Sequence, residues 1–117
     1  MSCIRDGGLG TGKVLANLDG RFVREGRDSF GHILVNLDGK VIREGSGSNG
    51  DILVIVDGKY IREGKDKDGE IIAWIDGDLI RQGEDSSGTA LFSIEGYASI
   101  YEKAALGAAA LLLKAMI

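Results

Sequence analysis

The sequence predicts a mostly β fold, a closed antiparallel ring or barrel of about ten short strands whose centre is plugged by an apolar C-terminal α-helix. Three observations predict it. An Asp-Gly motif recurs every 19 residues, half a repeat unit stands at each end of the series, and alanine and leucine replace the alternating pattern after Gly96. Repeats of this kind suggest a solenoid, propeller or barrel.

Each repeat unit is predicted to be a β-hairpin followed by a short link. In the second unit an apolar run at 32–37 precedes Asp38-Gly39, the run 40–44 follows, and a link at 45–50 leads onward. The equivalent turns and arginines are Asp19-Gly20 with Arg24, Asp57-Gly58 with Arg62, and Asp76-Gly77 with Arg81. Asp-Gly between two β-rich runs is typical of a type I′ turn, which places Leu37 opposite Lys40.

The half units at the two ends predict that the chain closes on itself. Residues 3–7 align with the second strand of a unit, and residues 89–94 align with a first strand. Pairing these two segments removes both free edges of the sheet. Four whole hairpins and this split one therefore give ten strands with pseudo-fivefold symmetry.

Alternation along the strands assigns one face to the interior. In the second unit the inward positions are Ile33, Val35, Leu37 and Ile42, and their equivalents in the other units are apolar as well. The outward face is mixed, and there each arginine is expected to cover an apolar side chain and to meet a nearby carboxylate. The expected apolar partners are Leu15, Leu34, Leu53, Ile72 and Leu91, and the expected acids are Asp6, Glu25, Glu44 and Glu63.

The segment 98–116 is predicted to be the helix that fills the ring. Its stretch 104–113 is apolar on all sides, which is typical of a buried helix or a membrane span, but ten residues are short of the roughly 20 that a span needs. A barrel of ten strands has a radius of about 10 Å, which suits a slim, alanine-rich helix at its centre. We therefore expect a single domain over 1–117, with hairpin repeats at 2–96 and the central helix at 97–117.

The charge and the cysteine content of the chain limit the partners and the cellular location that we expect. The net charge is −4, and arginine and lysine are spread along the repeats, which argues against a nucleic-acid partner. Cys3 is the only cysteine, so no internal disulfide is expected. Because the first residues also lack an apolar signal sequence, we expect a reducing, cytoplasmic location.

Motifs that resemble catalytic, cofactor or metal sites are explained by the repeat. Residues 7–13 resemble a phosphate-binding loop, but the two key glycines recur in every link and a strand follows where a helix is required. The acidic stretch 66–70 lacks the spacing of a calcium loop, and His32 has no second metal ligand. We therefore expect no catalytic, cofactor-binding or metal-binding residues and no enzymatic activity.

The candidate functional residues are a belt of arginines on the outward face, one from each unit: Arg5, Arg24, Arg43, Arg62 and Arg81. Such a belt would bind an anion, a lipid headgroup or an acidic partner, or else each arginine would serve only the fold. Outward apolar residues form a second candidate surface, for self-association or a protein partner. They are Phe22, Ile55, Tyr60, Trp74 and Leu79.

The unit Asp-Gly-x-x-Ile-Arg-x-Gly with its 19-residue period resembles the bacterial 4-fold beta flower repeat family over residues 2–96. This resemblance implies a ring of hairpins, as in a family of bacterial proteins of uncharacterised function, and supplies no activity. A barrel around an apolar helix is also similar in layout to tubby and scramblase-type proteins. We therefore expect a non-enzymatic binding or interaction module, with a membrane-peripheral protein that binds lipids or anions as the alternative.

Overall fold

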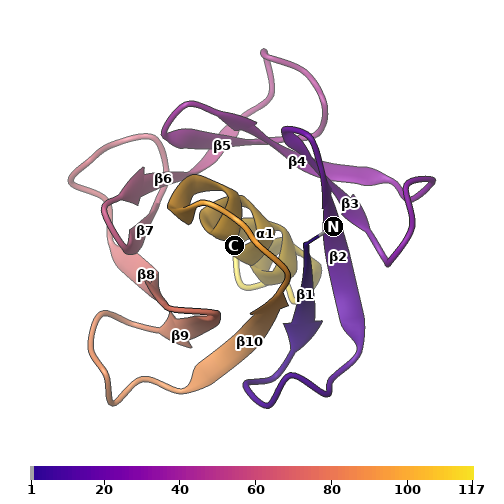
Figure 1. The fold of residues 1–117 in the computed structure, drawn as a ribbon. Coiled ribbons are helices and arrows are strands. Elements are labelled where there is room, and N and C mark those ends of the chain that lie inside the picture. The colour runs from indigo at the N-terminus through magenta and orange to yellow at the C-terminus, as the bar shows by residue number, and fades with distance from the viewer. Residues whose placement is uncertain (1) are drawn as a thin grey trace.

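The computed structural model describes residues 2–117 and shows a closed antiparallel barrel of ten strands around one C-terminal helix (Figure 1). Neighbouring strands in the chain are neighbours in the barrel throughout. The fold class predicted from the sequence is therefore confirmed.

The strands alternate in length, because each hairpin has a long first strand and a short second strand. The long strands are β2 (Val14–Asp19), β4 (Ile33–Asp38), β6 (Ile52–Asp57), β8 (Ile71–Asp76) and β10 (Ala90–Glu95). The short strands are β1 (Cys3–Asp6), β3 (Phe22–Glu25), β5 (Val41–Glu44), β7 (Tyr60–Glu63) and β9 (Leu79–Gln82). The helix α1 spans Ile100–Leu113.

The two half units meet as the sequence predicts. Strand β1 pairs with β2 on one side and with β10 on the other, where Ile4 lies opposite Ile94. Beyond the strand, the backbone N–H of Gly7 continues the ladder by donating to the carbonyl of Leu91 at 2.8 Å. This junction of β1 and β10, which we call the seam, leaves no open edge in the barrel.

The hairpin turns differ from the prediction by one position. Asp38 pairs with Val41 and Leu37 with Ile42, so the two turn residues are Gly39 and Lys40. Gly39 takes a φ of +63° while Lys40 does not take a positive φ, which fits a type II′ turn with glycine first. The predicted type I′ turn is wrong, yet the assigned faces of this hairpin survive, because the register changes by two residues and side chains alternate with a period of two.

A bulge between hairpins reverses the predicted faces at the start of each long strand. Ile42 pairs with Val54 but Arg43 pairs with Ile52, which leaves Leu53 as an extra residue. Leu53 consequently packs against the core, and Ile52 lies on the outside beside Arg43. The residues predicted to face inward that lie outside in this way are Val14, Ile33, Ile52, Ile71 and Ala90, each paired with a belt arginine. The apolar row predicted to lie outside packs against the core instead: Leu15, Leu34, Leu53, Ile72 and Leu91.

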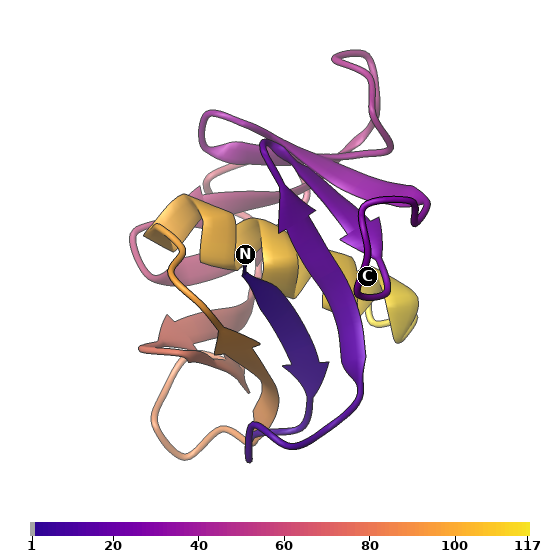
Figure 2. The ribbon, with the colours of Figure 1, turned by 45° about the vertical axis from the view of Figure 1, so that its right-hand side comes forward.

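The helix runs through the barrel from the end that holds the hairpin turns to the end that holds the links (Figure 2). Residues 104–111 are all buried, as expected for an apolar plug. Gly107 keeps the helix slim where it passes Ile61 and Ile80, since a Cβ there would lie 3.3 Å from the nearest atom of Ile80. Among residues 2–117, no helix is long and apolar enough to cross a membrane.

Both ends of α1 are fixed by local bonds. Ser99 caps the first turn and forms a capping box with Glu102, which satisfies N–H groups that the helix itself leaves unpaired. Lys103 reaches the turn carbonyl of Gly77 and the carboxylate of Asp78, and Lys114 pairs with Asp6 at the opposite end. These contacts define two ends of the barrel, which we call the turn end and the link end.

Candidate functional site

The belt arginines have the same two partners in every unit. In the second unit Arg43 donates from Nε to Oδ2 of Asp38 at 3.0 Å and from Nη1 to the carbonyl of Gly50 at 3.0 Å. Asp38 begins the turn of the same hairpin and Gly50 ends the link that follows. Arg43 therefore ties a turn to a link across the outer face.

The other four arginines repeat this arrangement. The carboxylate partners are Asp19 for Arg24, Asp57 for Arg62, Asp76 for Arg81 and Glu95 for Arg5, at 2.8–2.9 Å. The carbonyl partners are Gly31 for Arg24, Gly69 for Arg62, Gly88 for Arg81 and Gly12 for Arg5, at 2.8–3.0 Å.

These contacts favour the interpretation that the belt arginines serve the fold rather than bind a ligand. The side chains are only 19–25% exposed, and each positive charge already faces a carboxylate. The predicted acidic partners Asp6, Glu25, Glu44 and Glu63 are wrong, because these residues follow the arginine toward the link whereas Nε points back to the turn. The belt as a whole is thus a set of clamps rather than five free cations.

A second row of outer residues anchors the links and was not predicted. Asn36 is almost fully buried although it lies on the outer face, and its Nδ2 donates to the carbonyls of Gly45 and Gly47. Asn17 does the same in the first unit, and Trp74 donates from Nε1 to the carbonyl of Asp85 at 2.9 Å. The sequence did contain a signal that could have predicted this row, namely a polar side chain in the middle of an apolar strand. Such a side chain rarely stays buried without hydrogen-bond partners.

The predicted outward apolar surface is largely covered. Trp74 is buried, and Phe22, Ile55, Tyr60 and Leu79 are half-buried. Lys59 lies over the rings of Tyr60 and Trp74 at 5.5 and 5.0 Å, and Arg21 lies over Phe22 at 5.2 Å. This surface is therefore broken up by cationic side chains rather than being one apolar patch.

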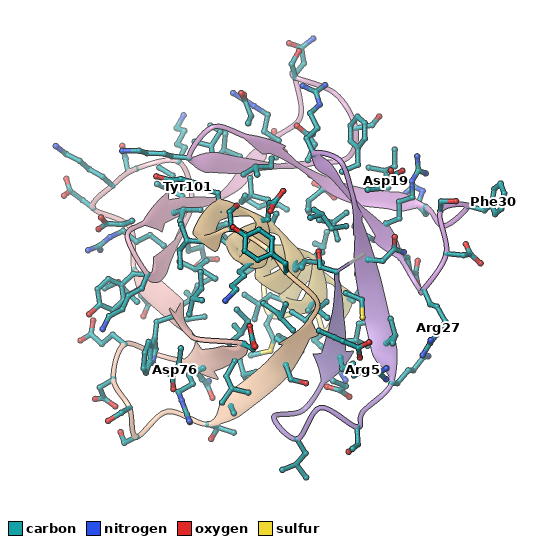
Figure 3. The ribbon with its side chains drawn as sticks, in the orientation of Figure 1. Arg5, Asp19, Arg27, Phe30, Asp76 and Tyr101 are labelled. Atoms are coloured by element: carbon teal, nitrogen blue, oxygen red, sulfur yellow. The ribbon has the colours of Figure 1, made fainter. Side chains whose placement is uncertain are left out.

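Large apolar side chains are exposed elsewhere. Tyr97 is 90% exposed, and Ile100 and Tyr101 beside it at the start of α1 are partly exposed. Figure 3 shows Tyr101 beside the first turn of α1, at the rim of the barrel. The links contribute Leu9 and Phe30, which are 89% and 93% exposed, and Phe30 points away from the barrel at the tip of its link.

The turn end combines these aromatic residues with positive charge. The residue after the turn glycine is Arg21, Lys40 or Lys59 in three successive hairpins, and all three are exposed. The turn aspartates beside them are already paired with belt arginines. We call the surface formed by Arg21, Lys40, Lys59, Tyr97 and Tyr101 the turn-end surface.

The link end carries the opposite charge. Its acidic residues include Glu25, Glu44, Asp51, Glu63, Asp66, Asp68, Glu70, Glu84 and Asp85, against fewer lysines and arginines. Hydrogen bonds from the hydroxyl and the N–H of Ser87 hold the pKa of Asp85 below its usual value. The link end therefore holds more acidic than basic residues, in a chain whose net charge is −4.

The sequence motifs that resemble a phosphate-binding loop or a metal site lie in ordinary structural positions. A side chain at Gly12, in the loop that resembles a phosphate-binding loop, would overlap the carbonyl oxygen of Asp6. This glycine is therefore required by the close approach of link and strand. His32 is exposed at the end of a link, and residues 2–117 contain no group of three metal-ligating side chains.

The surface of residues 2–117 includes the following hollows. Two flank the last turn of α1 at the link end, one floored by Ile72 and Leu111 and the other by Leu15 and Leu113, each of about 290 Å³. The third, of about 150 Å³, lies on the outer face at the seam and is lined by Cys3, Arg5, Val14, Arg27 and Glu95. Burial raises the pKa of the Cys3 thiol and Glu95 adds to this effect, while Arg5 opposes it.

Comparison with known proteins identifies one match. The model of a family described as "6-fold beta flower protein" matches residues 4–114. The kind of family inferred from the repeat is thereby confirmed, and the 4-fold form named from the sequence is corrected to the 6-fold form. No curated protein and no solved structure matches the chain.

Proposed function

Because the chain belongs to the 6-fold beta flower family, whose description names no activity, we propose from its surface that it is a non-enzymatic interaction module. Its partner is a protein segment that combines acidic and apolar side chains. The segment binds to the turn-end surface. One observation carries this proposal. Tyr97 is nearly fully exposed, and at the same end of the barrel three exposed cations form no ion pair with a carboxylate of residues 2–117.

Aromatic side chains supply much of the binding energy at protein interfaces. Tyrosine is enriched among the residues whose truncation costs at least about 2 kcal/mol of binding energy, since it buries a large area with little loss of conformational freedom. Tyr97 lies two residues before the N-cap Ser99 and Tyr101 lies in the first turn of α1, so both are on the segment that enters the helix. Tyr101 lies in the first turn of α1, and this fixed position lowers the cost of ordering its side chain on binding.

Charge favours an acidic partner. Arg21, Lys40 and Lys59 lie in three hairpin turns at the same end of the barrel, and the N-terminus of α1 adds a partial positive charge there. Complementary charge increases the rate of association and excludes partners of like charge. A non-enzymatic role is supported by the polar side chains of the repeat, because Arg43, Asp38 and Asn36 already form the bonds that hold turns and links in place.

The test compares partners captured by three forms of the protein. The wild type, a turn-end variant with Tyr97→Ser and Lys59→Gln, and a link variant with Phe30→Ser serve as baits, with quantitative mass spectrometry as the readout. Phe30→Ser is the matched control because Phe30 is as exposed as Tyr97 but lies on a link. The proposal expects a set of proteins with acidic, apolar segments that is lost only with the turn-end variant. Equal capture by all three baits would refute it.

Binding at a membrane surface is the second candidate, since tyrosine with lysine and arginine also suits the interface of an anionic bilayer. Flotation with phosphatidylserine vesicles separates the two candidates. Vesicle binding that is lost with Tyr97→Ser and at high salt would support the membrane role. Protein that stays in the aqueous fraction at low salt would exclude it.

A further inference from the structure

The fivefold pattern is broken on the outer face of the seam. The first outward position of each short strand is occupied by a larger side chain in the whole hairpins: Phe22, Val41, Tyr60 and Leu79. In β1 the same position holds Cys3, whose smaller side chain leaves the seam hollow of about 150 Å³. An engineered cavity of about this volume accommodates benzene, so a small molecule fits.

Two guanidinium groups from different elements line the seam hollow. Arg5 comes from β1, and Arg27 comes from the link that follows β3. Figure 3 shows both side chains at the same part of the outer face. They are therefore placed to act on one ligand.

The charge of the hollow is not balanced. Glu95 already accepts from Nε of Arg5 at 2.9 Å, and Gly12 accepts from Nη1 at 2.9 Å. Arg27 makes no ion pair with any residue of 2–117 and is exposed. The seam hollow thus carries one uncompensated positive charge, and Arg5 keeps donors that its two partners do not use.

We propose that the seam hollow is a binding site for a small oxyanion, a carboxylate or a phosphate, with Arg27 as the principal donor and Arg5 as the second. A guanidinium presents parallel N–H groups that match the oxygens of either anion. The apolar side chain of Val14 forms part of the wall and the thiol of Cys3 lies beside it. This site is independent of the turn-end surface.

The neutral state of Cys3 suits an anion. Because burial raises its pKa, the thiol stays protonated at neutral pH and adds no negative charge to the hollow. The equivalent place two units further along holds Val41 and Lys65 in place of Cys3 and Arg27. Lys65 therefore supplies a control position with a cation in the same part of a link but a larger strand residue beside it.

Binding is measured by isothermal titration calorimetry with sodium phosphate and, separately, sodium acetate in a buffer free of other oxyanions. The variants are Arg27→Gln, which removes the principal donor, and Cys3→Tyr, which fills the hollow with the side chain that Tyr60 places in the same fold. Lys65→Gln is the matched control. Circular dichroism and melting temperature report whether each variant folds.

The expected result is saturable binding of at least one anion, weakened tenfold or more by Arg27→Gln and by Cys3→Tyr but changed less than twofold by Lys65→Gln. Preference for phosphate or for acetate then decides the class of ligand. Absence of binding of both anions to the wild type overturns the proposal. Equal weakening by Arg27→Gln and Lys65→Gln also overturns it, because it would show attraction by general charge.

Discussion

Replacement of Arg43 by methionine tests whether the arginine belt is structural. The substitution keeps an unbranched apolar stem beside Ile52 but removes both donors, so the link loses its bond at the carbonyl of Gly50 and the turn loses its ion pair with Asp38. Asp38 is half exposed and water can replace its partner, whereas Gly50 is only partly accessible.

The expected cost follows from these two contacts. A hydrogen bond from a charged donor contributes about 1.5–3 kcal/mol, and a surface ion pair contributes about 0–1 kcal/mol after screening by solvent. Taking the lower part of both ranges, we expect Arg43→Met to lower the free energy of unfolding by about 2 kcal/mol. Asp38→Asn removes only the ion pair and is expected to cost about 0.5 kcal/mol.

Urea denaturation at low and at high salt measures both costs, and Arg62→Met repeats the test in a second unit because its partners and exposure are nearly the same. The double variant Arg43→Met with Asp38→Asn should be no less stable than Arg43→Met alone, within about 0.5 kcal/mol. A cost below about 0.5 kcal/mol for both Arg43→Met and Arg62→Met would refute the clamp and restore the belt as a free anion-binding surface.

Three further predictions concern the helix and the seam. Ala109→Asp places an unpaired charge in the barrel core and should abolish the cooperative thermal transition; unchanged melting would contradict the buried plug. Ala115 ends the helix with a φ of +57°, so Ala115→Gly should raise the free energy of unfolding by about 1 kcal/mol in urea, and a loss of stability would speak against this helix end. Because burial and Glu95 raise the pKa of Cys3, alkylation by iodoacetamide should accelerate only at a higher pH than for a free cysteine, and Glu95→Gln should move that pH downward. The raised pKa also means that Cys3 contributes stability below its unfolded pKa, which is lost as pH rises through the folded value; a reactivity profile like that of free cysteine would contradict this account.

The ring could be predicted because its repeat recurs along the chain, and the plug could be predicted because residues 104–113 are apolar on all sides. The position of Arg5 in a half unit shows that β1 needs a partner, and residues 89–94 are the one first strand without a second. Residues 104–113 have no polar face, so there are few places other than the interior of the ring where a helix formed by them can lie.

The bulge could not be predicted, because the residues around it are apolar in either arrangement. Ile52, Leu53 and Val54 follow one another, so a change of face between the first two leaves no polar residue in the core to signal it. The turn register was hidden for a related reason, since a shift of two residues keeps every side chain on its face.

The arginine belt could be predicted in its members but not in its contacts, and the turn-end surface was not predicted at all. The five belt arginines were identified from the repeat, yet their carboxylate partners depend on the turn register that the sequence left open. Arg27 was missed because it occurs in only one link and touches the seam from a neighbouring unit. Contacts between units of a ring follow from its three-dimensional closure rather than from the pattern of one unit.

The closure of the ring is tested most directly by nuclear magnetic resonance on uniformly labelled protein. Ile4 lies opposite Ile94 and Asp6 opposite Phe92 at the seam, although about 90 residues of chain separate the members of each pair. We predict cross-strand nuclear Overhauser effects between the Hα atoms of Ile4 and Ile94, as intense as those within a hairpin. Contacts from β1 to β2 alone, with none to β10, would contradict the closed barrel.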